Sequence, residues 1–172
     1  MLKSKTISMR LIEESDAEFV LNLRLDPRYN NFLSKVEASL DGQKKWIINY
    51  KNDEYEQKQF YFIIERNDGV PCGTVRIYDI RNDSFCWGSW ILNEDKTRYA
   101  AIESALLVYD FGFNKLKYLK SHFDVMKGNQ KVINFHKKFG AVQTGEDEQN
   151  YYFEISKESV ELFKEKFKVL YV

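Results

Sequence analysis

The chain has 172 residues, which is long enough for one compact domain with a sizeable core. Hydrophobic residues make up 44% and charged residues 30%, values that are ordinary for a globular protein in water. The 26 basic and 26 acidic residues give a formal net charge of zero. This balance argues against nucleic-acid binding, which normally requires a basic surplus on one face.

The cysteines and the N-terminus indicate the compartment. Cys72 and Cys86 fall in expected strands without the spacing of a metal site, so we interpret them as buried thiols in a reducing environment. The first six residues lack the apolar core of a signal peptide, and no apolar run reaches the roughly 18 residues of a membrane span. We therefore expect a cytoplasmic protein with no metal and no membrane or nucleic-acid partner.

The N-terminal half alternates helix and strand signals. Ser15 and Glu18 have the spacing of a capping box, and Asp26-Pro27 ends the helix that follows. Asn67-Asp68-Gly69 is a favoured hairpin turn. The expected elements are a strand over 6–11, helices over 15–25 and 41–50, and strands over 59–66, 70–80 and 85–92.

The C-terminal half continues without a domain boundary, so residues 1–172 are expected to form a single domain. A polar loop from Asn93 to Tyr99 feeds the N-terminus of an apolar helix beside a strand end, an arrangement suited to phosphate binding. The expected elements are a helix over 100–113, a strand over 118–125, a helix over 132–140, strands over 141–145 and 150–155, and a closing helix over 159–168.

This order of elements resembles the GNAT superfamily of acetyl-CoA-dependent N-acetyltransferases. The segment Asn129-Gln130-Lys131-Val132-Ile133-Asn134-Phe135-His136-Lys137-Lys138-Phe139-Gly140 is similar to the family pattern Asn-x-x-(Ala/Ser/Val)-Ile-x-(Phe/Leu)-(Tyr)-x-Lys-x-Gly. The resemblance implies an α/β fold with a mixed, mostly antiparallel sheet of about seven strands and four to five helices. It also implies that strands four and five, here residues 85–92 and 118–125, splay apart.

The same resemblance implies acetyl-CoA as co-substrate, with its pantetheine arm against the main chain of strand four and its pyrophosphate on the following loop. The family loop carries glycines where this chain has Thr97 and Tyr99. Asn129 is expected to contact the cofactor, although helix capping alone would explain it. The expected cofactor-binding residues are Trp90, Ile91, Leu92, Lys96, Thr97, Arg98, Tyr99, Ala100 and Asn129.

Two histidines are candidate catalytic residues. His136 stands where many relatives have a tyrosine that protonates the departing thiolate, a task that general acid catalysis makes ~10²–10⁴-fold faster. The alternative is a half-buried helix residue with a structural hydrogen bond. His122 shares a strand face with Asp124 and is expected to accept the proton of the amine if that face borders the cleft. If the face meets solvent, His122 is ordinary strand surface.

The N-terminal half resembles, more weakly, the branch that acetylates amino sugars on nucleotide carriers, through Asn22-Leu23-Arg24, the loop 29–32 and Gln43–Trp46. A small-molecule amine is therefore the expected acceptor, and the protein is a monomer or a homodimer. The alternatives are a protein N-terminal (ribosomal-protein) or polyamine acetyltransferase, and a non-catalytic acyl-CoA-binding module. The expected acceptor-site residues are Arg24, Tyr29, Asn30, Trp46, Trp87 and Ser89, with the tryptophans alternatively serving only as core.

Overall fold

The computed structural model describes residues 1–171, and side chains as far as Lys168. The strands are β1 (Leu2–Lys3), β2 (Ile7–Leu11), β3 (Phe60–Arg66), β4 (Pro71–Tyr78), β5 (Ser84–Leu92), β6 (Lys120–Met126), β7 (Val142–Glu146) and β8 (Asn150–Ser156). The helices are α1 (Ala17–Leu25), α2 (Leu40–Tyr55), α3 (Ala100–Asp110), α4 (Gln130–Phe139) and α5 (Lys157–Tyr171), with short helical turns η1 (Glu14–Asp16) and η2 (Phe111–Lys115).

All the strands belong to one sheet in the order β1-β2-β3-β4-β5-β6-β8-β7, antiparallel except between β5 and β6. The predicted mixed, mostly antiparallel sheet is confirmed, with eight strands where about seven were expected. The additional strand is β1, which pairs with β2 through Leu2 and Lys3. Two residues are too few to leave an alternation signal in the sequence.

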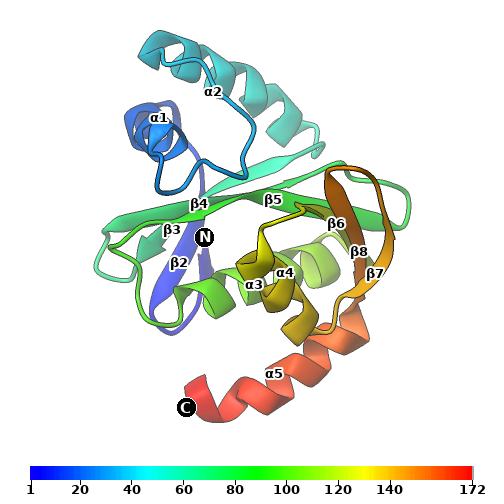
Figure 1. Ribbon diagram of the computed structural model, residues 1–172. Helices are drawn as coiled ribbons and strands as arrows, with labels where there is room; N and C mark the ends of the chain where they lie inside the picture. Colours follow the sequence, from blue (N-terminus) through cyan, green and yellow to red (C-terminus); the bar gives the residue numbers. More distant parts are fainter. Residues whose placement is uncertain (172) are drawn as a thin grey trace.

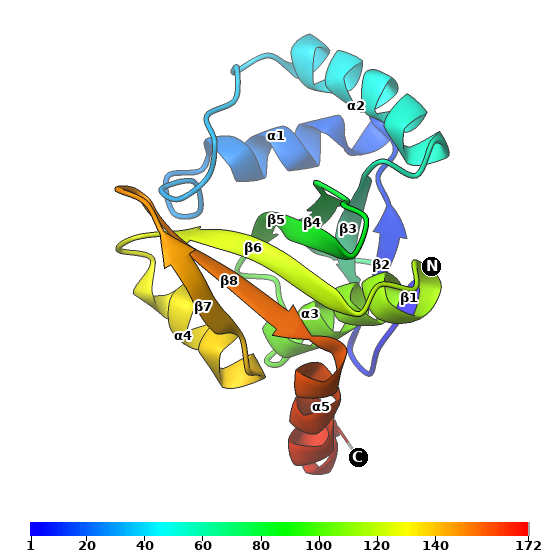
Figure 2. The same ribbon diagram turned by 90° about the vertical axis from the view of Figure 1, so that its right-hand side faces the viewer.

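Helices cover both faces of the sheet. Figure 1 shows α1 and α2 on one side of the strands and α3, α4 and α5 on the other, and Figure 2 shows the same layers from the side. The upper layer is held by a small apolar cluster that includes Val20, Ile47 and Tyr61. The larger core lies on the opposite face, around Phe85, Tyr109 and Phe153. The two faces of the sheet are therefore covered by different helices (Figure 1).

Several predicted boundaries differ from the structure by a few residues, and two of them are at the first and second helices. The capping box at the start of the first helix is formed by Glu13 and Asp16 rather than by Ser15 and Glu18. Arg10 explains the shift, because both of its terminal nitrogens bond the Asp16 carboxylate at 2.8 Å and fix the turn there. The second helix also continues five residues beyond the expected end at Tyr50 and finishes at Tyr55.

The predicted splay between residues 85–92 and 118–125 is confirmed. β5 and β6 pair only at their first residues, Ser84 with Lys120 and Phe85 with Ser121. Beyond that point β5 stays paired with β4 and β6 stays paired with β8. The sheet therefore opens as a wedge whose closed end lies at the start of both strands.

Candidate functional site

A cavity of about 440 Å³ lies where β5 and β6 part. Its walls come from β5, β6 and α4, with the loop after α1 and two β4 side chains closing the remaining side. The lining residues are Arg24, Phe32, Leu33, Ser34, Arg76, Tyr78, Trp87, Gly88, Ser89, Trp90, Phe123, Asp124, Val125, Met126, Asn129, Val132, His136, Gln149 and Asn150. We call it the wedge cavity.

A β-bulge on β5 shapes this cavity. The pairing with β4 shifts by one residue between Thr74 opposite Ile91 and Arg76 opposite Gly88. Ser89 lies in the shift with a φ of 48°, and its carbonyl accepts a hydrogen bond from the Thr74 hydroxyl at 3.2 Å. Bulges bend a strand and re-aim its groups, and they are common beside active sites. The bulge therefore turns the β5 main chain at the point where the wedge opens.

His136 lies on the α4 side of the wedge cavity and is buried. Its ring packs 4.2 Å from the Phe123 ring and 5.3 Å from that of Trp87, centroid to centroid. Burial lowers the pKa of His136 to about 3, so the imidazole is neutral near pH 7. Its Nδ1 is buried without a hydrogen-bond partner among the described residues. The predicted acid role of His136 stays a prediction, and the group available for it is a neutral imidazole.

His122 does not line the wedge cavity. Its Nδ1 lies 2.6 Å from the Ser84 hydroxyl and its Nε2 lies 2.9 Å from the Asp79 carboxylate. These contacts join the end of β4, the start of β5 and β6 at the closed end of the wedge. Both ring nitrogens are thus engaged within the protein, an arrangement that suits a positioning role. The predicted proton-accepting role of His122 stays a prediction.

The loop between β5 and α3 is ordered without glycine. Asn93 caps its turn by accepting the Asp95 amide at 2.9 Å, and Thr97 bonds the Thr6 hydroxyl at 2.6 Å. Lys96 and Arg98 are exposed and form no ion pair within the described part of the chain. Two cations without an ion pair therefore precede the N-terminus of α3, where helix amides attract anions, and the exposed Glu94 and Asp95 stand earlier in the same loop.

The remaining predicted cofactor residues fall into two groups. Trp90, Ile91 and Leu92 lie on β5 beyond the last β5–β6 pair, so their strand has no neighbour on the wedge side. Tyr99 and Ala100 stand at the junction with α3. Asn129 precedes α4 and lines the wedge cavity, but its side chain makes no capping hydrogen bond. Capping by that side chain therefore does not account for Asn129.

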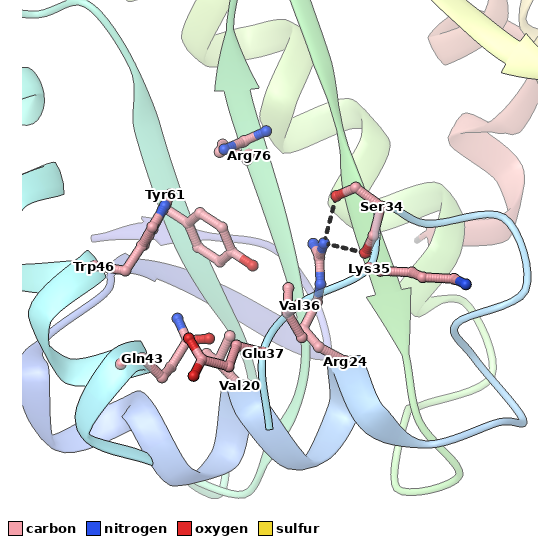
Figure 3. A pocket seen from close by; sticks show the side chains of 11 residues that line it. Val20, Arg24, Ser34, Lys35, Val36, Glu37, Gln43, Trp46, Tyr61 and Arg76 are labelled. Carbon is pink, nitrogen blue, oxygen red and sulfur yellow. Dashed lines mark hydrogen bonds between the residues drawn. The ribbon is translucent and has the colours of Figure 1, made fainter. Parts of the chain in front are cut away.

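A second cavity of about 350 Å³ lies between α1, α2 and the upper face of β3 and β4. We call it the upper cavity, and Figure 3 shows Arg24, Tyr61 and Arg76 bordering it. Arg24 is 8% exposed, and one terminal nitrogen bonds the Ser34 carbonyl at 2.9 Å and hydroxyl at 2.8 Å. The Arg76 guanidinium lies 4.4 Å from the Tyr78 ring centroid. Both arginines border both cavities, which are thus neighbours.

The structure brings together some of the predicted acceptor residues. Arg24 and Trp46 line the upper cavity, while Trp87 and Ser89 line the wedge cavity together with Arg24. Tyr29 and Asn30 line neither. Their amides bond the Asp26 carbonyl in the turn after α1.

Sequence reasoning missed Arg76 as a site residue. The register explains its position, because Arg76 pairs with Tyr61 on one side and with Gly88 on the other. It thus lies on the face that α1 and α2 cover. Only the alternation along β4 offered a signal, and alternation does not tell which face is lined by a cavity.

Comparison with known proteins identifies this architecture. The family profile of the acetyltransferase (GNAT) domain matches residues 7–142. The chain belongs to the GNAT acetyltransferase family. It is therefore an N-acetyltransferase, and its family uses acetyl-CoA.

Among solved structures, apo FdhC, described as a nucleotide-linked sugar GNAT, is 48% identical to this GNAT chain, with a TM-score of 0.91 over 99% of this chain and 98% of that one. YjcK of Bacillus subtilis (strain 168), described as a probable N-acetyltransferase, is 28% identical over 153 residues, 80% of this chain and 84% of that protein. A spermidine N-acetyltransferase from Vibrio cholerae, solved with CoA and spermine, is 18% identical with a TM-score of 0.76 over 90% and 97% of the two chains. That last likeness is one of fold.

None of the described helices combines the length and the apolar character needed to cross a membrane. The described residues also contain no cluster of three or more histidine, cysteine or acidic side chains arranged to hold a metal ion.

Proposed function

We propose that this GNAT enzyme transfers the acetyl group of acetyl-CoA to the amine of a nucleotide-linked amino sugar. The observation that carries the acceptor class is the pair of guanidinium groups, Arg24 and Arg76, where the two cavities meet. Neither forms an ion pair with a carboxylate in the described part of the chain, and the Nε of each is buried without a partner. A diphosphate supplies the missing negative charge, and guanidinium groups match phosphate geometry well.

The charge of the upper cavity separates this acceptor from a polyamine. Its lining contains three basic side chains, Arg24, Lys35 and Arg76, against one acidic side chain, Glu37. A polycation such as spermidine would meet repulsion there, whereas a nucleoside diphosphate would be attracted. The likeness to FdhC at 48% identity supports the same acceptor class.

The open edge of β5 fits the acetyl-CoA that the family uses. From Gly88 to Leu92 the main chain of β5 faces the wedge instead of a neighbouring strand, and an extended ligand can add to such an edge. Lys96 and Arg98, beside the α3 N-terminus, are placed to hold its phosphates. When bound, acetyl-CoA supplies a thioester whose carbonyl an amine can attack directly.

Positioning is the main contribution that we assign to the protein. Holding two reactants together in the right orientation can contribute up to ~7–11 kcal/mol toward a barrier. The bulge at Ser89 and the walls formed by Trp87 and Trp90 orient the reacting groups. We propose that His136 donates a hydrogen bond from its neutral ring to the departing sulfur.

We also propose that residues 1–172 work as one acyltransferase domain in the cytoplasm. The wedge cavity draws its lining from positions between Arg24 and Asn150, so most of the chain contributes to one site. Cys72 and Cys86 are both free and buried, and burial raises the pKa of the Cys72 thiol to about 11. Such protected thiols suit a reducing compartment.

A thiol-release assay tests the acceptor class. Purified protein is incubated with acetyl-CoA and a panel of uridine- and thymidine-diphosphate sugars that carry a free amine. Spermidine and an N-terminal peptide are tested separately as alternative acceptors. We expect turnover with at least one nucleotide-linked amino sugar and none with spermidine or the peptide. Turnover with spermidine or the peptide, and none with the sugar panel, would overturn the proposal.

Arg76→Gln tests whether the Arg76 guanidinium binds the acceptor. A hydrogen bond to a charged group contributes ~1.5–3 kcal/mol, so loss of one guanidinium contact is expected to raise the acceptor KM by about 10- to 100-fold. The KM for acetyl-CoA is expected to stay within about threefold. Arg66→Gln is the matched control, because Arg66 lies at the β3 end and pairs with Asp68 outside both cavities. Equal effects on both substrates would remove Arg76 from the acceptor site.

A further inference from the structure

The wedge cavity has one acidic side chain among its described lining residues, Asp124 on β6. The Asp124 side chain is exposed and makes no hydrogen bond or ion pair with any residue that the structure describes, although the Asp124 main chain pairs with Tyr152 of β8. Neighbouring carboxylates are partnered. Asp79 bonds His122 and Arg81, and Glu154 and Asp83 both contact Lys120. An unpartnered carboxylate in a cavity is poised to receive a cation from a ligand.

Asp124 and Phe123 lie on opposite faces of β6. Residues alternate between the two faces of a strand, so Asp124 shares its face with His122, whose ring contacts Ser84 and Asp79. Phe123 takes the opposite face and packs on Trp87 and His136. The Asp124 carboxylate is therefore on one face of β6, and the ring cluster of Phe123, Trp87 and His136 is on the other.

Gly88 adds no side chain to the part of the wedge cavity between Asp124 and the two arginines, Arg24 and Arg76. Arg76 on β4 pairs with Gly88, and a Cβ at Gly88 would lie 2.9 Å from the Tyr78 hydroxyl. A side chain at this position would have to displace the Tyr78 hydroxyl, whereas glycine leaves it in place. The cavity has a positive side at Arg24 and Arg76 and a negative group at Asp124, with the Ser89 bulge also lining it.

We infer that Asp124 binds the ammonium group of the acceptor and accepts its first proton, which fixes the acceptor with its amine at β6 and its diphosphate at Arg24 and Arg76. This inference rests on the proposed function. His122 is less suited, because both of its ring nitrogens are already engaged and it does not line the cavity.

The ammonium group gives one proton to the Asp124 carboxylate, which passes it to solvent because the side chain is exposed. The nitrogen lone pair then forms the N–C bond, and the C–S bond breaks with its electron pair on sulfur. The second nitrogen proton ends on the coenzyme A thiol. One acetyl group moves, one proton is released to solvent, and no oxidant or reductant is needed.

The test compares an amine with its hydroxyl analogue. Wild type, Asp124→Asn and Asp124→Glu are assayed with the nucleotide-linked amino sugar that wild type acetylates best. Inhibition by the same nucleotide sugar with a hydroxyl in place of the amine is measured in parallel. Glu158→Gln is the matched control, since Glu158 is an exposed carboxylate on α5 that lines neither cavity.

We expect Asp124→Asn to lower kcat/KM for the amine at least tenfold. The inhibition constant of the hydroxyl analogue and the KM for acetyl-CoA are expected to stay within about threefold of the wild-type values. Asp124→Glu is expected to recover part of the loss, and Glu158→Gln is expected to behave as wild type. An unchanged kcat/KM in Asp124→Asn, or an equal loss for the hydroxyl analogue, would overturn the inference while wild-type turnover upholds the proposed function. Wild type inactive on the whole sugar panel would overturn both.

Discussion

Because His136 is buried, the unfolding free energy is expected to depend on pH by an amount that can be calculated. The pKa of His136 is lowered from 6.5 to about 3 in the folded protein by burial. The unfolded chain therefore takes up a proton near pH 6.5 that the folded chain does not, so stability falls as the pH drops through 6.5. The penalty at pH 5 is RT ln(1 + 10^1.5), or ~2 kcal/mol, and at pH 7.5 it is below about 0.1 kcal/mol.

Replacing His136 by a side chain that does not titrate removes this penalty. His136→Phe suits the surroundings, because the ring lies among Trp87, Phe123 and Phe135 and its Nδ1 has no partner to lose. His136→Asn is the polar counterpart. The two variants differ in stability at pH 7.5, yet both are expected to lose ~2 kcal/mol less than wild type between pH 7.5 and pH 5.

Urea denaturation followed by tryptophan fluorescence at pH 7.5, 6.5, 5.5 and 5.0 measures the effect. The difference in unfolding free energy between each variant and wild type should change with pH by the same amount in both variants. Other acidic groups contribute equally to all three proteins and cancel in the difference. Parallel stability profiles for wild type and both variants would refute the burial argument for His136.

Three further predictions concern residues around the wedge that do not line its cavity. Gly73→Ala places a Cβ 2.2 Å from the Ile91 carbonyl oxygen, so it is expected to lower the unfolding free energy by ~1–3 kcal/mol and to weaken coenzyme A binding. Urea denaturation and calorimetry measure the two effects. Gly145→Ala is the control and should be neutral in both experiments, because its Cβ would make only a 3.8 Å contact. Reversing Lys96 and Arg98 together to Glu should weaken coenzyme A binding more than acceptor binding by calorimetry, and equal effects would remove the loop from the phosphate site. His122→Asn should lower stability by ~1–3 kcal/mol with most of kcat retained, and a folded variant without turnover would assign His122 a catalytic role.

The splay of the sheet could be predicted because the order of elements resembles that of the GNAT superfamily, and the resemblance implies the splay. Residues 85–140 are predicted to form a strand, a helix, a second strand and a second helix in that order. The structure has these elements as β5, α3, β6 and α4. The bulge at Ser89 left no comparable signal. A φ of 48° on a serine is dictated by pairing with β4, which is a long-range contact.

The acceptor side was harder to predict for the same reason. Arg24 and Trp46 were predicted because they lie on helices that resemble those of known relatives, and Trp87 and Ser89 were predicted because they share a strand face. Arg76 was missed, because a residue on a strand could face either layer. Burial of a polar group also leaves no local signature. His136 is followed by two exposed lysines, and only the packing of Trp87 and Phe123 against its ring makes it a buried, neutral group.

A crystal structure with bound coenzyme A tests the central claim most directly. The account predicts an extended pantetheine arm along the main chain of Trp90–Leu92, between β5 and β6, with the thiol beside Ser89 and His136 and the phosphates at Lys96 and Arg98. Coenzyme A bound elsewhere on the protein, or β5 and β6 paired along their full length in the complex, would contradict it.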